Sequence, residues 1–364
     1  MRSFRNACRA AVCAAALALV APAASAQGAP AAPAAPAAGT AAPVVGAEAQ
    51  AQRQRVQPGN NAPAWRAVNS EAEHVTTLPR WEGGRLIQTG GESWRQLRNG
   101  PVTVIGGWAL VAAVVGVALF FALKGQMKLH GAETGRRIER FTLLERTVHW
   151  ALAISFVLLA VTGILLLFGK HVVLPVIGAT AFSWIAIVSK VVHNYVGPLF
   201  AVTVVATLLV FLRDNIPNRR DLEWVRKGGG MFTGEHVPSH RFNAGEKTWF
   251  WVGVFALGIA VSASGFVLDF PNFEQTRATM QLAWTVHAIG ALLFMLMSVG
   301  HIYMGTIGMQ GSYRAMRTGY VDETWAKEHH QLWYDDIAAG RIPARRSGTS
   351  SAPSAPSTGR PQAV

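Results

Sequence analysis

Five long apolar runs constrain this chain more than any other feature of its sequence. They cover residues 101–123, 148–168, 191–212, 249–268 and 280–307, and none contains Asp, Glu, Lys or Arg. Each is long enough to cross about 30 Å of hydrocarbon as an α-helix. With 51% of its 364 residues hydrophobic and 15% charged, the chain is too apolar for a large soluble helical protein. The sequence therefore predicts an all-α integral membrane protein.

The N-terminus has the pattern of a secretory signal. Three arginines precede an apolar stretch at residues 10–20, and residues 24–26 (Ala-Ser-Ala) form a small-residue cleavage site. We expect a signal peptide over residues 1–26, with an uncleaved membrane anchor as the alternative. In either case the segment that follows is exported.

The only cysteines of the chain, Cys8 and Cys13, lie within this signal. A mature chain would then have none, which excludes disulfides, cysteine-ligated iron–sulfur clusters and thioether-attached haem. Residues 27–100 begin with a stretch rich in Ala and Pro that cannot bury a core. We interpret them as a periplasmic tether ending in a short ordered patch.

The net charge of +13 comes from particular loops and does not indicate nucleic-acid binding. Basic residues gather between the first and second spans, between the third and fourth, and after the fifth, whereas the loops at residues 169–190 and 269–279 carry few. Positively charged loops stay in the cytoplasm. We therefore expect a multi-pass protein of the bacterial inner membrane with a periplasmic mature N-terminus and a cytoplasmic tail at residues 311–364.

Histidines within the spans form two sets at matched depths. His287 and His301 lie fourteen residues apart on one apolar run, on one helix face and about 21 Å apart along the axis. The predicted topology places His193 at the depth of His287, near the periplasm, and His149 at the depth of His301, near the cytoplasm. Ionisable groups at such depths usually mark a cofactor or an ion path. Two facing imidazole pairs predict axial ligation of two non-covalent b haems.

Other residues have plainer interpretations. A single histidine at a membrane boundary is more often interfacial than a ligand, so only the matched pairing favours haem. The remaining histidines, including His171 and His330, are expected on the solvated surface. Glycines in the spans allow close helix packing, or, at Gly197 and Gly290, room for a porphyrin.

Several motifs resemble the cytochrome b (gamma) subunit of respiratory formate dehydrogenase. They are residues 145–150 (Glu-Arg-Thr-Val-His-Trp), 193–198 (His-Asn-Tyr-Val-Gly-Pro), 213–218 (Arg-Asp-Asn-Ile-Pro-Asn), 241–247 (Arg-Phe-Asn-Ala-Gly-Glu-Lys), 300–304 (Gly-His-Ile-Tyr-Met) and 325–330 (Trp-Ala-Lys-Glu-His-His). The resemblance covers about residues 138 to 342. It implies a four-helix dihaem core, here over residues 124–310, preceded by one extra transmembrane helix at residues 101–123.

The resemblance also implies partners and a quinone site. Electrons would arrive from an iron–sulfur (beta) subunit beside a molybdenum- or tungsten-containing catalytic (alpha) subunit and would leave to quinone at the cytoplasmic side. Matched to the family's quinone motif, Asn243, Gly245 and His301 become candidate quinone contacts. An amide can hydrogen-bond a quinone carbonyl and a glycine admits a ring, but Asn-Ala-Gly before a helix is also an ordinary N-cap.

The sequence thus predicts the dihaem cytochrome b anchor of a formate dehydrogenase, with no formate-oxidising site of its own. An anchor of a hydrogenase or another respiratory dehydrogenase has the same chemistry. A membrane transporter is the alternative from a different class, although the inverted repeats or broken helices typical of transporters are not evident.

Overall fold

The computed structural model describes residues 74–75, 85–87, 89–230, 237–273 and 275–347. The predicted signal peptide, both cysteines and most of the predicted tether lie outside these residues. The described residues all belong to one structural unit that begins at Trp65.

Within the described residues, five helical stretches are long and apolar enough to cross a membrane, as the sequence predicts. They are Gly90–Lys124, Leu143–Val172, Leu174–Phe211, Ala244–Asp269 and Arg277–Gly308. In order, the elements that compose them are α4 (Thr89–Leu97), η1 (Arg98–Ile105) and α5 (Gly106–Lys124); α6 (Leu143–Val172); α7 (Leu174–Phe211); α9 (Ala244–Thr248), η4 (Trp249–Leu257) and α10 (Gly258–Asp269); and α11 (Arg277–Tyr303) with η5 (Met304–Gly308).

Local signals explain where these helices begin. Thr142 caps α6 and Asn243 caps α9, each in a reciprocal capping box with the glutamate three residues later. The first span begins earlier than its apolar run, because α4 at Thr89 continues without interruption into η1 and α5.

The expected loop at residues 169–190 is wrong, because this segment is almost entirely helical. α6 continues to Val172, and α7 begins at Leu174. The turn is made at Val173 and at Gly178, whose φ of 78° lies in a region that glycine adopts without strain. Helices that extend beyond the hydrocarbon can be polar there, so the apolar runs mark the membrane-spanning part and miss the helix ends.

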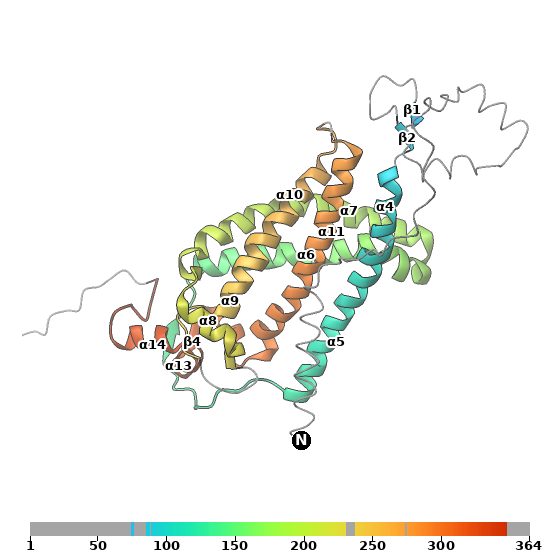
Figure 1. Cartoon of the computed structure of the whole chain (residues 1–364). Helices are drawn as coiled ribbons and strands as arrows, with labels where there is room; N and C mark the ends of the chain where they lie inside the picture. Colours follow the sequence, from blue (N-terminus) through green and yellow to red (C-terminus); the bar gives the residue numbers. More distant parts are fainter. Residues whose placement is uncertain (1–73, 76–84, 88, 231–236, 274, 348–364) are drawn as a thin grey trace, which may run out of the picture. The chain divides into compact units, whose positions relative to one another are not determined.

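Four spans form the core. α6 packs along α7, α10 packs along α11, and α10 also contacts α7; Figure 1 shows the α6–α7 pair crossing the α10–α11 pair. A buried cluster joins them where Phe200 and Val204 of α7 meet Val254 of η4 and Phe294 of α11.

The extra span packs on the outside of α11. Val102 of η1 is buried with Ala288 and Leu292, and a Cβ atom on Gly106 would lie 2.6 Å from a methyl carbon of Leu292. The helix therefore lies against the element that carries both His287 and His301.

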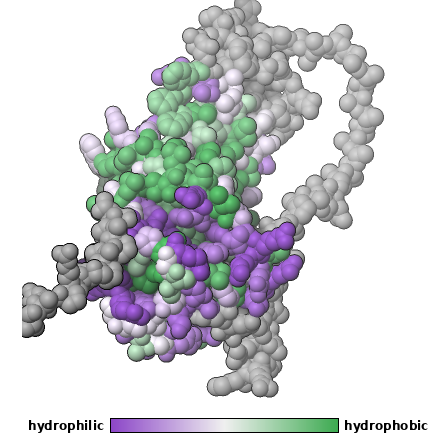
Figure 2. Space-filling model, turned by 90° about the vertical axis from the view of Figure 1, so that its left-hand side faces the viewer, coloured by the Kyte–Doolittle hydropathy of each residue, from purple (hydrophilic) through white to green (hydrophobic). Residues whose placement is uncertain are grey.

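Short elements form a polar cap at one end of the spans. They are β3 (Arg137–Glu139) paired antiparallel with β4 (Tyr320–Asp322), η2 (Arg213–Asn215), α8 (Arg219–Arg226), η3 (Gly228–Gly230), α12 (Ser312–Thr318), α13 (Glu323–His329) and α14 (Gln331–Ala338). A separate two-stranded ribbon pairs β1 (His74–Val75) with β2 (Arg85–Ile87). Figure 2 shows hydrophobic surface over the spans and a hydrophilic band over the cap.

Candidate haem-binding site

The structure brings the four candidate histidines together as two facing pairs. His149 of α6 faces His301 of α11, with ring centroids 6.2 Å apart and ring planes at 52°. His193 of α7 faces His287 of α11, with centroids 6.0 Å apart and planes at 73°. One helix, α11, thus contributes one ring to each pair. We call His149 and His301 the cap-side pair, and His193 and His287 the far pair.

The ring separations fit axial ligation of one iron by each pair. A bond of about 2.0 Å from metal to imidazole nitrogen, plus about 1.2 Å from that nitrogen to the ring centroid, separates opposed centroids by about 6.4 Å. The measured values of 6.2 and 6.0 Å agree with this spacing. The centroid spacing of both pairs therefore fits one iron between the two rings.

Hydrogen bonds orient both rings of the far pair. Nδ1 of His193 lies 2.8 Å from the Thr162 hydroxyl, and Nδ1 of His287 lies 2.9 Å from the Val261 carbonyl oxygen. The carbonyl can only accept, so Nδ1 of His287 carries the proton and donates. A ligand histidine held in this way keeps its Nε2 lone pair for the metal.

The cap-side pair is held differently. Nδ1 of His149 is buried and has no hydrogen-bond partner among the described residues. A hydrogen bond from Nδ1, such as orients the rings of the far pair, is therefore missing from His149 among the described residues. The His301 ring stacks on Trp249, with centroids 4.6 Å apart and planes at 12°.

The sequence suggests that Gly197 and Gly290 leave room for a porphyrin. The surroundings of the two glycines differ in this respect. A Cβ atom on Gly197 would meet no atom within 4 Å, so this position is open. A Cβ atom on Gly290 would lie 3.0 Å from a methyl group of Val261, which shows that Gly290 serves the close packing of α11 on α10.

Asn243 and Gly245 lie at the start of α9, at the cap end of the fourth span. The Asn243 side-chain oxygen accepts the Glu246 backbone N–H at 3.0 Å, so the residue is the N-cap that the sequence offered as the alternative to quinone contact. A Cβ atom on Gly245 would lie 2.8 Å from the Trp224 ring. The sequence suggests that Gly245 leaves room for a quinone ring; in the structure the indole ring of Trp224 lies there.

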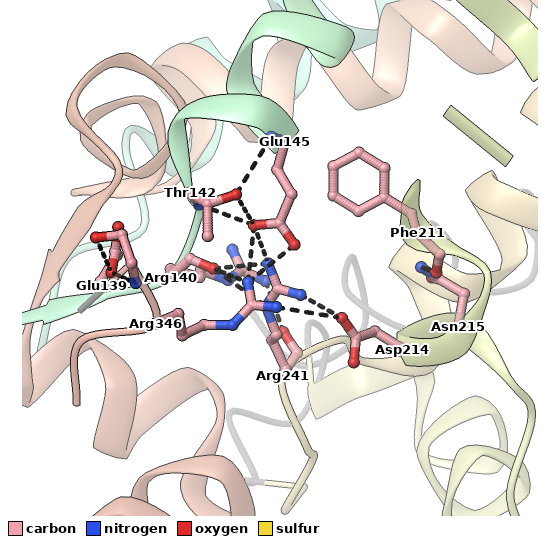
Figure 3. Close-up of polar contacts among 10 residues, drawn as sticks. Glu139, Arg140, Thr142, Glu145, Phe211, Asp214, Asn215, Arg241 and Arg346 are labelled. Atoms are coloured by element: carbon pink, nitrogen blue, oxygen red, sulfur yellow. Dashed lines mark hydrogen bonds and ion pairs between the residues drawn. The ribbon is translucent and has the colours of Figure 1, made fainter. Parts of the chain in front are cut away.

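Charged residues from three of the sequence motifs meet in one buried cluster, shown in Figure 3. Arg241 lies between Glu145 and Asp214, with its Nη2 2.8 Å from Glu145 Oε2 and an ion pair to Asp214. Arg346, near the C-terminus, adds a second guanidinium 2.7 Å from Glu145 Oε2. Arg241 and Glu145 are almost fully buried. The cluster fixes the start of α6, one turn before His149, against the segment that leads into α9.

His330 is buried, which contradicts the expectation that it lies on the solvated surface. Only 1% of it is exposed, and its Nδ1 donates to the His240 carbonyl at 2.7 Å. Burial, with a smaller effect of the nearby Arg140 guanidinium, lowers the pKa of His330 from 6.5 to about 3. Its Nε2 lies 3.9 Å from Glu246. Trp325 and Trp333, which contact the ring from α13 and α14, are the only nearby sequence signal of its burial among the described residues; its other contacts come from residues distant in sequence.

Comparison with known proteins shows what this core is similar to. Residues 140–319, which contain both histidine pairs, match the family model described as prokaryotic cytochrome b561. This segment is similar to the prokaryotic cytochrome b561 family. A cytochrome b561 core implies haem b as its cofactor, in agreement with the paired imidazoles.

The similar proteins are all cytochrome b556 subunits of formate dehydrogenases. The chain is 27% identical over 209 residues to the cytochrome b556(fdo) subunit of formate dehydrogenase from Escherichia coli K12, covering 55% of this chain and 93% of the relative. It is 26% identical over 207 residues to the subunit of the nitrate-inducible enzyme of the same strain, covering 56% and 92%. The Haemophilus influenzae subunit is 27% identical over 211 residues, covering 57% and 86%.

These relatives confirm the resemblance to formate dehydrogenase cytochrome b subunits that the motifs indicated. They cover little more than half of this chain. The match to the family model begins at residue 140 and therefore does not include the extra helix, which ends at Lys124.

Proposed function

We propose that this protein is the membrane-anchoring cytochrome b subunit of a formate dehydrogenase and that it binds two b haems. The far pair, His193 and His287, would hold one haem and the cap-side pair, His149 and His301, the other. The observation that carries the proposal is the presence of two facing imidazole pairs, each at the spacing of a bis-histidine iron site, inside a cytochrome b561 core.

The charge distribution supports an orientation. The cap contains the basic loops after the first, third and fifth spans, which favours a cytoplasmic cap and a periplasmic far pair. Electrons would then enter from a periplasmic iron–sulfur subunit at His193 and His287, pass to the haem of His149 and His301, and reduce quinone beside Asn243. Proton uptake from the cytoplasm would accompany quinone reduction. Bound haem supplies reversible one-electron transfer, and the chain supplies its ligands and its position.

The N-cap role of Asn243 is compatible with quinone contact. Its oxygen is occupied by the Glu246 backbone N–H, while the side-chain amide still has two N–H donors. One of them can donate to a quinone carbonyl.

Purification from the native membrane tests the proposal. We expect two haems per chain, both extractable by acid acetone, and co-purification of an iron–sulfur subunit with a formate-oxidising molybdenum or tungsten subunit. One haem per chain, or haem that resists extraction, would contradict the cofactor assignment. Co-purification with a hydrogenase would replace formate dehydrogenase as the partner.

A further inference from the structure

The hydroxyl of Thr162 occupies a special position beside the far pair. Thr162 is in α6, whereas the ring that it contacts belongs to His193 of α7, so this hydrogen bond joins two spans. The next residue along α6 is Gly163, where an added Cβ atom would lie 3.4 Å from the His193 ring. The imidazole therefore rests against the backbone of α6 at this point, and Thr162 is the polar group that meets it there.

The surroundings of the Thr162 hydroxyl allow it to accept a hydrogen bond from His193. Its oxygen lies 2.8 Å from the Leu158 carbonyl oxygen, one turn earlier in α6, so the hydroxyl can donate there. A hydroxyl has one hydrogen and two lone pairs, so the oxygen can then accept from Nδ1–H of His193. This arrangement belongs to the His193 tautomer in which Nε2 has the free lone pair, the one that ligation of iron through Nε2 requires.

We propose that Thr162 is the positioning residue of the far haem ligand and that its hydroxyl lowers the reduction potential of that haem. The inference rests on the proposed function only in assuming that His193 ligates haem iron. An Nδ1–H that donates to an oxygen makes the imidazole a more basic ligand, which favours ferric over ferrous iron. His149 of the cap-side pair has no such partner on Nδ1 among the described residues. The hydroxyl thus favours electron flow from the far haem to the cap-side haem.

The test is a redox titration of the haems in native membranes. Thr162→Val keeps the shape of the side chain but removes the hydroxyl, Thr162→Ser keeps the hydroxyl, and Thr207→Val is a matched control. The control removes another buried hydroxyl in the spans, one that bonds only a backbone carbonyl. Haem content, midpoint potentials and the electron paramagnetic resonance signals of the ferric haems are measured for each variant.

We expect Thr162→Val to raise the midpoint potential of one haem component and to change its resonance signal, while the other component is unchanged. Thr162→Ser and Thr207→Val should match the wild type. If Thr162→Val instead loses one haem and Thr162→Ser retains it, the positioning role is also supported. Unchanged potentials and signals at full haem content, or an equal shift in Thr207→Val, would overturn the inference.

Failure of the proposed function gives a different result. The titration uses chemical mediators and requires neither formate nor quinone, so a different dehydrogenase partner leaves the Thr162 comparison intact. A wild-type chain with one haem contradicts the two-haem proposal directly, before any variant is compared.

Discussion

Each of the four paired imidazoles has its own immediate surroundings. Nδ1 of His193 shares a hydrogen bond with a side-chain hydroxyl, and Nδ1 of His287 donates to a backbone carbonyl. His301 stacks on an indole, and Nδ1 of His149 has no hydrogen-bond partner among the described residues. A helix holds a side chain only at its Cα, so these contacts decide how each ring is turned about its χ angles. The two proposed haem sites therefore share a ligand type but differ in electronic character.

Removal of one ligand from each pair should separate the two haems. His193→Ala should lower haem content by about half and stop reduction by the dehydrogenase partner, while the remaining haem is still reduced by added quinol. His149→Ala should leave a haem that the partner reduces and quinone cannot reoxidise. Haem assay and reduction kinetics in membranes provide the measurement. His171→Ala, an exposed position, serves as the control. Two intact haems in both pair variants would refute the ligand assignment.

Substitution of Asn243 separates quinone contact from helix capping. Asn243→Ala should weaken quinone binding by roughly 1 to 3 kcal/mol, the usual effect of leaving a polar group without its hydrogen-bond partner. Asn243→Ser retains a capping oxygen but lacks the amide donor, so its quinone-dependent reoxidation should be as slow as that of Asn243→Ala. Quinone-dependent reoxidation of the haems, measured together with haem content, reports the effect.

The matched control is Asn218→Ala. Asn218 caps α8 through the same reciprocal arrangement, with Asp221. Loss of this cap should cost about 1 kcal/mol of stability with unchanged reoxidation. If Asn243→Ala reoxidises like the wild type and loses only stability, Asn243 is a cap and nothing more.

Burial of His330 predicts a loss of stability in mild acid. The pKa of His330 is about 3 in the folded chain, against 6.5 for an exposed histidine, so the unfolded chain binds a proton first as the pH falls. Its contribution to stability is complete above pH 6.5 and decreases as the pH falls toward 3. Between pH 7 and 5, wild type should lose roughly 1 to 2 kcal/mol that a His330→Gln variant does not lose. Thermal unfolding in detergent at both pH values measures the difference, and equal losses would contradict it.

Much of the histidine site could be predicted from sequence, and its surroundings could not. Spacing on one helix and the order of charged loops paired His193 with His287 and His149 with His301. Thr162 gave no such signal, because a threonine in a span usually bonds its own helix backbone, and only the approach of α7 brings His193 to it. His330 was missed because its burial depends on cap elements that are distant in sequence.

At the scale of elements, apolar runs located all five spans but not their ends. The helix α7 extends well beyond its apolar run, back to Leu174, because helix ends outside hydrocarbon are set by turns and caps instead of hydropathy. The sequence predicted the extra span but not the helix against which it packs, because its apolar residues are spread evenly around the helix and mark no packing face. Its neighbour in the structure is α11.

A glycine contact makes the docking of the extra span testable. Gly106→Val should force Leu292 aside, because a Cβ atom would lie 2.6 Å from its methyl carbon, and overpacking of this kind costs about 1 to 3 kcal/mol. Gly116→Val is the control on the same helix, where a Cβ atom meets nothing within 4 Å. We expect a lower unfolding temperature for the first variant alone. Equal temperatures would show that α5 does not depend on this contact.

At the scale of the whole molecule, the buried ion cluster joins segments more than 200 residues apart. The four residues come from four parts of the chain: the C-terminal segment (Arg346), the segment before α9 (Arg241), η2 after α7 (Asp214) and the start of α6 (Glu145). The sequence motifs contained three of these residues, but their roles could not be assigned, because charges that flank membrane spans usually face water.

Loss of Arg241 should destabilise the cap strongly. Arg241→Ala removes the guanidinium that pairs with both Glu145 and Asp214. A buried charge left with no partner costs roughly 3 to 5 kcal/mol; because Arg346 stays beside Glu145, we expect a loss of up to about 3 kcal/mol. Arg341→Ala removes an exposed guanidinium paired with Asp336 and should cost less than about 1 kcal/mol. Thermal unfolding of both variants measures the contrast. Similar, small effects would show that the cluster does not hold the cap.

The placement of one ring from each pair on α11 restricts how this sequence can change during evolution. A substitution between residues 287 and 301 that keeps α11 regular leaves the relative orientation of the two rings intact, whereas insertion of a single residue there turns one ring by about 100° and advances it by about 1.5 Å. No adjustment of α6 or α7 alone can restore the lost alignment, because each of those helices supplies a ring to only one pair. The interval between His287 and His301 should therefore be fixed in length, whereas its composition is restricted only where it packs, as at Gly290, Leu292 and Phe294.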